Sequence, residues 1–277
     1  MEIINRIPRM ASTGRELRAE GQRIGLVPTG GALHEGHLSL MSRARELCDS
    51  VVVSIFTDQA DNASVDLARD AELALTRGVD FIFAPAADVM FGEGFATSVT
   101  VEGLSEKLED AAFPGHYQRV TTVFNKLLNI VDPHFVFLGR KHAQRAILVK
   151  RMVRDLAMNV EVVVCPTVRE EDGLALSGAN VSLSTEERKA ATALRRSLER
   201  CRSHYAGGDR DAGRLIASMR SAIEAEPLAR IDYAAITDTE RLDPVNVVSG
   251  GSPTLVSLAV YIGSTRLTDN IVLDGEL

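Results

Sequence analysis

Short apolar runs alternate with longer segments of helical periodicity over the first 165 residues. The apolar runs, rich in β-branched residues, predict buried strands at 24–27, 50–56, 79–85, 135–139 and 160–165. Apolar residues at helical spacing predict helices between them, at about 37–47, 66–76, 120–130 and 143–156. This alternation of continuous apolar strands with helices predicts a parallel sheet that is covered on both faces.

The pattern changes after about residue 173. Ser184 and Glu187 have the spacing of a capping box and predict the start of a charged helix, and a second helix follows Gly207 and Gly208. The remaining apolar runs predict strands at 231–237, 254–263 and 265–273. We therefore expect two domains, an α/β domain at residues 1–176 and a smaller α+β domain at residues 177–277.

Composition narrows the possible functions without selecting one. The chain has 277 residues, of which 45% are hydrophobic and 25% charged, and it carries a net charge of −7. These values argue against a disordered chain and against a polycationic surface for nucleic acid or acidic lipid. No apolar run approaches the roughly 20 residues of a membrane span. Three dispersed cysteines favour a reduced, cytoplasmic protein. We therefore expect no nucleic-acid partner and no membrane association.

The segment TGGALHEGH, residues 29–37, lies between the first predicted strand and the first predicted helix. A helix N-terminus presents unpaired N–H groups and the positive end of the helix dipole, which suit a phosphate. His34 and His37 are three residues apart, so both imidazoles can lie on one side of the turn. The segment predicts a nucleotide phosphate site, and the alternative is a pair of surface histidines. Two histidines without a third ligand do not predict a metal site.

Two further segments carry candidate chemistry. GRKHAQR, residues 139–145, places Lys141 and Arg145 just after a strand, where anionic ligands bind to parallel sheets. These two cations share one helix face if a helix begins there, and the alternative is a solvated basic face. VREEDGLALSGAN, residues 168–180, lies at the domain boundary and predicts either a closing loop or only a polar hinge.

Together these segments resemble the pantothenate synthetase (pantoate–β-alanine ligase) family of H-x-G-H nucleotidyltransferases. The similarity extends over nearly the whole chain, through ordered blocks at 27–40, 51–56, 78–85, 113–123, 139–145, 166–177 and 263–270. It implies a Rossmann-like N-terminal domain with a small C-terminal lid, usually in a homodimer. It also implies a two-step reaction with ATP and Mg²⁺ on a small carboxylic acid and an amine. The carboxylate attacks the α-phosphorus to form an acyl-adenylate, and the amine then displaces AMP.

The resemblance also implies roles for individual positions. The implied catalytic residues are His34, His37 and Lys141. The implied ATP-binding residues are these three with Thr29, Gly30, Gly36, Gly139, His142, Val168, Ser177 and Gly178. The acid would be bound by Gln59 or Asp61 together with Gln144 and Arg145. Arg266, Asp269 and Asn270 match positions to which we assign a structural role.

Several of these positions depart from the family pattern. The family loop Leu-Ser-Ser-Arg-Asn is replaced by LSGAN at residues 176–180, so a hydroxyl and a guanidinium are absent. Arg145 stands where the family has a pantoate-binding glutamine. Further replacements are Gly30 for methionine, His142 for an acid, Phe113 and Gln118 for two arginines, and residues 57–62 for the family's Val-Asn-Pro-x-Gln-Phe. Loss of one preorganised donor typically costs about 3–4 kcal/mol of transition-state stabilisation.

These departures leave more than one function open. The default is ligation of pantoate to β-alanine. If Asp61 rather than Gln59 takes the place of the family's other pantoate-binding glutamine, then Asp61 and Arg145 replace two neutral amides. This pair suits an acid with an ammonium and a second anionic group, which is the same chemistry on another substrate. Arg145 or Arg119 could also replace the charge that is missing at Ala179. An adenylyltransferase and a weakly active or non-catalytic nucleotide-binding homologue are the hypotheses from other classes.

Overall fold

The computed structural model describes residues 1–56, 66–111 and 113–277. These residues form two compact units. The first comprises residues 1–139 and 148–165, and the second comprises residues 140–147 and 166–277. The division into domains at residues 176 and 177 stays a prediction, and the compact units place 140–147 and 166–176 with the C-terminal residues.

The first unit is built on a parallel sheet. Within the described residues its six strands have the order β1-β4-β3-β2-β5-β6, and every paired neighbour is parallel. The strands are β1 (Glu2–Ile4), β2 (Ile24–Thr29), β3 (Ser50–Ile55), β4 (Phe81–Phe83), β5 (Phe135–Gly139) and β6 (Glu161–Cys165). Because β2 lies between β3 and β5, the segments that leave the carboxyl ends of these strands begin at one edge of the sheet. The five predicted strands are confirmed.

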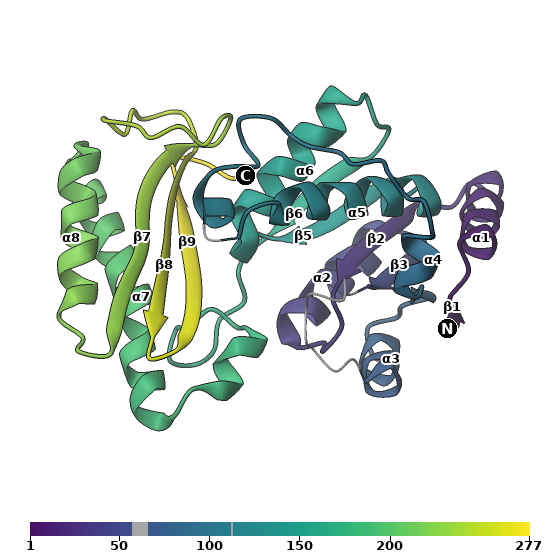
Figure 1. The fold of residues 1–277 in the computed structure, drawn as a ribbon, viewed down its shortest axis with the longest axis horizontal. Coiled ribbons are helices and arrows are strands. Elements are labelled where there is room, and N and C mark those ends of the chain that lie inside the picture. Colours follow the sequence, from purple (N-terminus) through teal and green to yellow (C-terminus); the bar gives the residue numbers. More distant parts are fainter. Residues whose placement is uncertain (57–65, 112) are drawn as a thin grey trace. The chain divides into compact units, whose positions relative to one another are not determined.

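Helices connect the strands of this sheet (Figure 1). They are α1 (Ile7–Ala19), α2 (Glu35–Leu47), α3 (Leu67–Leu75), α4 (Ala87–Met90), α5 (His116–Val131) and α6 (Ala143–Asp155), with 3₁₀ turns η1 (Leu108–Ala111) and η2 (Arg140–His142). The four predicted helices are confirmed, but α2 begins at residue 35 rather than 37 and α5 at residue 116 rather than 120. The helix α6 begins at Ala143, after the 3₁₀ turn that contains Lys141, so the condition for Lys141 and Arg145 to share one helix face is not met.

The first strand and first helix of the structure have no counterpart among the predictions. Arg6 precedes α1 and makes no side-chain capping hydrogen bond, so the side-chain N-cap signal is missing and Pro8 in the first turn is the start signal that is present. The helix packs closely against α5 through a glycine. A Cβ atom on Gly14 would lie 2.4 Å from the carbonyl oxygen of Val131, so a larger residue there would push the two helices apart.

The second unit is a small α+β assembly. It contains η3 (Gly178–Ser182), α7 (Thr185–Ala206) and α8 (Ala212–Glu224), followed by the antiparallel strands β7 (Ala229–Asp238), β8 (Thr254–Ile262) and β9 (Thr265–Leu273). The predicted capping box is confirmed, because Ser184 Oγ accepts from the Glu187 N–H and the Glu187 carboxylate accepts from the Ser184 N–H. The fold class, a parallel α/β unit with a smaller α+β unit, is confirmed as well.

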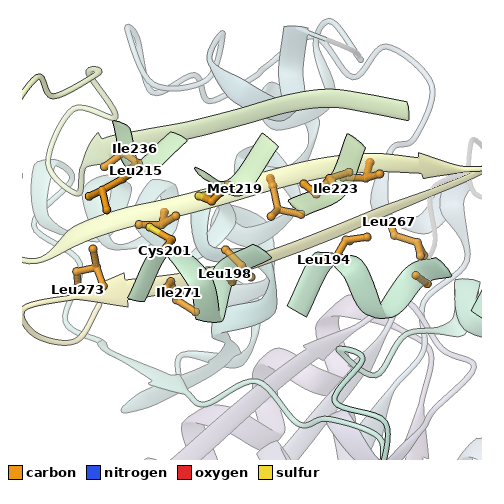
Figure 2. Packing of buried hydrophobic residues seen from close by; sticks show 14 of the residues in the cluster. Leu194, Leu198, Cys201, Leu215, Met219, Ile223, Ile236, Leu267, Ile271 and Leu273 are labelled. Carbon is orange, nitrogen blue, oxygen red and sulfur yellow. The ribbon is translucent and has the colours of Figure 1, made fainter. Parts of the chain in front are cut away.

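Buried apolar side chains fill the space between the two helices and the sheet of the second unit (Figure 2). Leu198 and Cys201 project from α7, Leu215 and Met219 from α8, and all four are fully buried. They meet Ile271 of β9 within the same cluster. This interlocking of helix and strand side chains is what makes the C-terminal residues a unit with a core of their own.

The three cysteines, all within the described ranges, are free and buried. Desolvation raises the pKa of the Cys48 and Cys201 thiols to about 11 and also raises the pKa of Cys165. These side chains are therefore protonated near pH 7 and behave as small apolar core residues. Over the described ranges, no helix combines the length and the apolar composition needed to cross a bilayer.

Replacing Leu198 with alanine should lower the free energy of unfolding by about 2–5 kcal/mol, because it leaves a cavity between α7 and the sheet. Urea unfolding followed by circular dichroism measures this change. Leu228→Ala is the matched control, since Leu228 is 43% exposed and should cost far less. Equal losses for the two variants would contradict the packing described above.

Candidate active site

The turn between β2 and α2 begins at Thr29, whose hydroxyl group makes two hydrogen bonds. Thr29 Oγ1 donates to the carbonyl oxygen of Ser54 at 2.8 Å and accepts from the Gly31 N–H at 3.3 Å. Gly31 and Ala32 then take left-handed backbone angles, with φ of 81° and 49°. Two such residues in succession reverse the chain within a short distance, and glycine adopts this conformation without the strain that other residues bear. The turn thus delivers the next residues directly to the helix start.

His34 and His37 cap the N-terminus of α2 with their own side chains. His34 Nδ1 accepts from the Gly36 N–H at 3.1 Å, and His37 Nδ1 accepts from the His34 N–H at 3.4 Å. The two rings stack with their centroids 4.0 Å apart and an interplanar angle of 26°. Because each Nδ1 accepts a hydrogen bond, the proton of each neutral ring lies on Nε2. Two Nε2–H donors at a helix N-terminus form an arrangement suited to an anion.

In the second unit, Lys141 lies in a turn that a distant asparagine holds. The Asn270 side-chain amide donates to the carbonyl oxygens of Arg140 and Lys141, at 2.9 Å in both cases. Asn270 is only 4% exposed, and its own N–H donates to Asp269 Oδ1. The strand β9 therefore fixes the main chain on both sides of the Lys141 α-carbon.

The loop from Val168 to Asn180 is fixed within the second unit by a buried ion pair. Arg169 binds Asp269 through two hydrogen bonds of 2.7 and 3.0 Å, and these side chains are 19% and 2% exposed. Arg169 also donates to the Gly173 carbonyl, and the Asn180 amide donates to the Ala175 carbonyl at 3.0 Å. An unpaired partner of such an ion pair would be costly to bury, so the bonds hold the loop in one conformation.

Sequence comparison identifies the family. The sequence model of the family described as pantoate-beta-alanine ligase matches residues 2–272. The chain belongs to the pantoate–β-alanine ligase family. The expected family, and with it the expected ligase, are confirmed.

Full-length relatives and solved structures agree with this assignment. The pantothenate synthetase of Pelotomaculum thermopropionicum is 47% identical over 100% of both chains, and that of Heliobacterium modesticaldum is 48% identical over 99% of this chain and 100% of its own. A pantothenate synthetase structure from Thermus thermophilus has a TM-score of 0.89 at 39% identity, covering 98% and 99% of the two chains. The ligase from Francisella tularensis, solved with beta-gamma ATP and β-alanine, has a TM-score of 0.78 at 29% identity, covering 98% and 97%.

The predicted site residues of this ligase are found in both units. The first unit brings Thr29, Gly30, His34, Gly36 and His37 together in one turn, and Gly139 ends the neighbouring strand β5. The second unit contains Lys141, His142, Gln144, Arg145, Val168, Ser177 and Gly178. Gln59 and Asp61, the two candidates for the acid site, lie outside the described residues. The individual ligand-binding roles stay predictions.

The predicted site residues of the second unit differ in burial and in hydrogen bonding. Ser177 Oγ accepts from the Ala179 N–H at 3.3 Å and caps η3, so its hydroxyl orders the altered LSGAN loop. Gln144 is 5% exposed, whereas His142 and Gly178 are exposed. Arg145 Nε is buried, and no atom among the described residues accepts a hydrogen bond from it. Among those residues, no three His, Cys, Asp or Glu side chains gather as metal ligands would, and the absence of a metal site stays a prediction.

Two of the departures lie near the start of α5. The Gln118 amide donates to Ser98 Oγ at 3.2 Å and to Thr100 Oγ1 at 2.8 Å, so it fastens the segment before η1 to the helix. Phe113 is 53% exposed. Gln118 therefore holds two segments of the first unit together, and no sequence motif predicted this contact.

The structural role assigned to the C-terminal motif is confirmed by its contacts. Arg266 pairs with Asp232 at 2.8 Å, Asp269 with Arg169, and Asn270 holds the Lys141 turn. The contact of Asn270 was missed from the sequence because its two partners lie 130 and 129 residues away. The motif at residues 263–270 identified Asn270 as a candidate but did not predict which residues it contacts.

Asn270→Ala should raise the KM for ATP about tenfold, because two main-chain bonds of roughly 1 kcal/mol each are lost from the turn that carries Lys141. Steady-state kinetics with varied ATP measures this. Asp232→Asn is the matched control, since it weakens an ion pair in the same sheet without touching that turn. An unchanged KM for ATP in Asn270→Ala would contradict the prediction that Asn270 positions Lys141 for ATP binding.

Proposed function

We propose that this chain ligates pantoate to β-alanine at the expense of ATP, releasing AMP and pyrophosphate through an acyl-adenylate. The observation that carries the proposal is the stacked histidine pair at the N-terminus of α2, in a chain of the pantoate–β-alanine ligase family. Each neutral imidazole that caps the helix through Nδ1 keeps an Nε2–H group that takes no part in the cap. That arrangement serves a phosphate on which negative charge increases during the reaction.

In the first step the pantoate carboxylate attacks the α-phosphorus of ATP and pyrophosphate leaves. The Nε2–H groups of His34 and His37 donate to phosphate oxygens, and the first N–H groups of α2 add the positive end of the helix dipole. The ammonium group of Lys141 neutralises further phosphate charge. Each preorganised donor of this kind is typically worth about 3–4 kcal/mol in the transition state.

In the second step the β-alanine amine attacks the acyl carbon and AMP leaves. The carboxylate alone is a poor acyl donor, and the mixed anhydride is a good one that water would also hydrolyse. The protein must therefore shield the anhydride until the amine arrives. The loop that Ser177 orders, within a segment anchored by the ion pair of Arg169 and Asp269, is our candidate for that cover.

Three further features belong to the proposal. ATP arrives as its magnesium complex, since Mg²⁺ commonly keeps phosphate oxygens and water as most of its ligands. The protein acts as a homodimer, which light scattering of the purified chain would test. It works in the cytoplasm on small molecules, without nucleic acid or membrane as a partner.

A second candidate substrate class is favoured by one observation. The buried Nε of Arg145 has no hydrogen-bond acceptor among the described residues. A buried donor without an acceptor is costly, and an anionic group of a substrate would remove that cost. The same adenylation chemistry on an acid with a second anionic group is therefore the alternative.

Acid-dependent exchange of labelled pyrophosphate into ATP tests both candidates. We expect exchange with pantoate, as the family assignment requires. The alternative would instead be established if exchange needs an acid with a second anionic group. In that case Arg145→Gln should shift the acid preference toward pantoate. No exchange with any acid in the panel would contradict adenylation itself.

The histidine pair allows capping and catalysis to be separated. His34→Asn keeps an oxygen where Nδ1 caps the helix, because asparagine is among the best N-cap residues, but it lacks the Nε2 donor. Exchange should fall about 10²–10³-fold at an unchanged thermal midpoint. His34→Gln is the converse control, with a polar group near the Nε2 position but no cap, and should lower the midpoint instead. Normal exchange in His34→Asn would contradict the role of Nε2.

A further inference from the structure

A buried carboxyl group lies behind the histidine turn. Asp70, in the first turn of α3, has an exposed fraction of 0%. Its Oδ1 accepts from the Leu33 N–H at 2.8 Å, and its Oδ2 is buried without a hydrogen-bond partner among the described residues. Arg69 forms an ion pair with Asp70, and the Arg69 Nη1 lies 3.9 Å from Oδ1 on a side chain that is 58% exposed.

This placement is unfavourable for folding. A carboxyl group that is removed from water is stabilised only when donors satisfy its oxygens, and here one oxygen has none within the described chain. The exposed Arg69 side chain offers little compensation, because solvent screens it. The Asp70 carboxyl group is therefore not explained by stability alone, and the hydrogen bond that it accepts from Leu33 within the described chain indicates its role.

That bond ends at the residue immediately before His34. The preceding residues, Gly31 and Ala32, have left-handed backbone angles and belong to no regular helix or strand. The Leu33 N–H would therefore lack a main-chain acceptor of the kind that regular structure provides. Next along the chain, the His34 N–H donates to His37 Nδ1, so a shift of the main chain at Leu33 displaces both rings.

We infer that Asp70 is a positioning residue that orients His34 and His37 through the Leu33 N–H. It touches no substrate, and it acts on the adenylation step by fixing where the two Nε2–H donors point. The inference rests on the proposed function, because it assigns the histidines to that reaction. A displacement of about 1 Å can cost 10²-fold in rate, so a loosened turn would be visible in the kinetics.

Asp70→Asn tests the inference. Its amide oxygen accepts the Leu33 N–H more weakly than a carboxylate does, and its NH₂ group replaces an oxygen that already has no partner among the described residues, so one unsatisfied buried group is exchanged for another. We expect pyrophosphate exchange to fall at least tenfold, while the KM for the acid changes by less than threefold and the thermal midpoint changes little. Asp66→Ala is the matched control, because it removes the N-cap of the same helix, where Asp66 Oδ1 accepts from the Arg69 N–H at 3.1 Å. It should lower the midpoint and leave exchange at temperatures below the midpoint unchanged.

Two results would overturn the inference. One is undiminished exchange in Asp70→Asn, and the other is a loss of exchange accompanied by a lower thermal midpoint, as a purely structural residue would give. Exchange by the unaltered protein tests the proposed function separately. The imidazole NMR signals of His34 and His37, with His204 of α7 as internal reference, report on ring orientation without any turnover. They should shift in Asp70→Asn and stay in place in Asp66→Ala.

Discussion

The hydrogen bonds that both imidazoles accept on Nδ1 are the constraint on which the proposed chemistry depends. They come from the N–H groups of Gly36 and His34, so the helix that the rings cap also sets their orientation and their tautomer. A ring protonated on Nδ1 would lose its cap, and a ring rotated about its bonds would do the same. The same hydrogen bonds therefore determine both the capping of the helix and the direction of the Nε2–H groups. The carbonyl of Ser54 and the carboxyl of Asp70 anchor that turn to the neighbouring strand and helix.

The second unit holds its predicted site residues in a different way, through main-chain atoms. Asn270 binds the carbonyl oxygens of Arg140 and Lys141, and Ser177 binds the N–H of Ala179. Bonds of this kind do not depend on which side chain a position carries. The scaffold therefore tolerates histidine at position 142 and alanine at position 179. The departures from the family pattern fall on side chains that these bonds do not use, which explains how a divergent site can lie on an intact fold.

The sequence predicted the elements whose signals are local. The β2 and β5 strands were found because buried parallel strands are continuous apolar runs, and α7 because its capping box lies within four residues. The start of α2 was placed too late, since histidine is not a usual N-cap residue. The contact of Asp70 with Leu33 spans 37 residues and that of Asn270 with Arg140 spans 130. Such pairings depend on the folded topology, and nothing in the spacing of polar and apolar residues encodes them.

Neither compact unit is a single stretch of chain, because residues 140–147 belong to the second unit and residues 148–165 return to the first. During synthesis the N-terminal sheet therefore lacks β6 until residue 165 has left the ribosome. By then the Lys141 turn has already emerged, more than a hundred residues before Asn270 of β9. That turn has no Asn270 partner until β9 has been synthesised, so it is among the last parts of the second unit to become fixed.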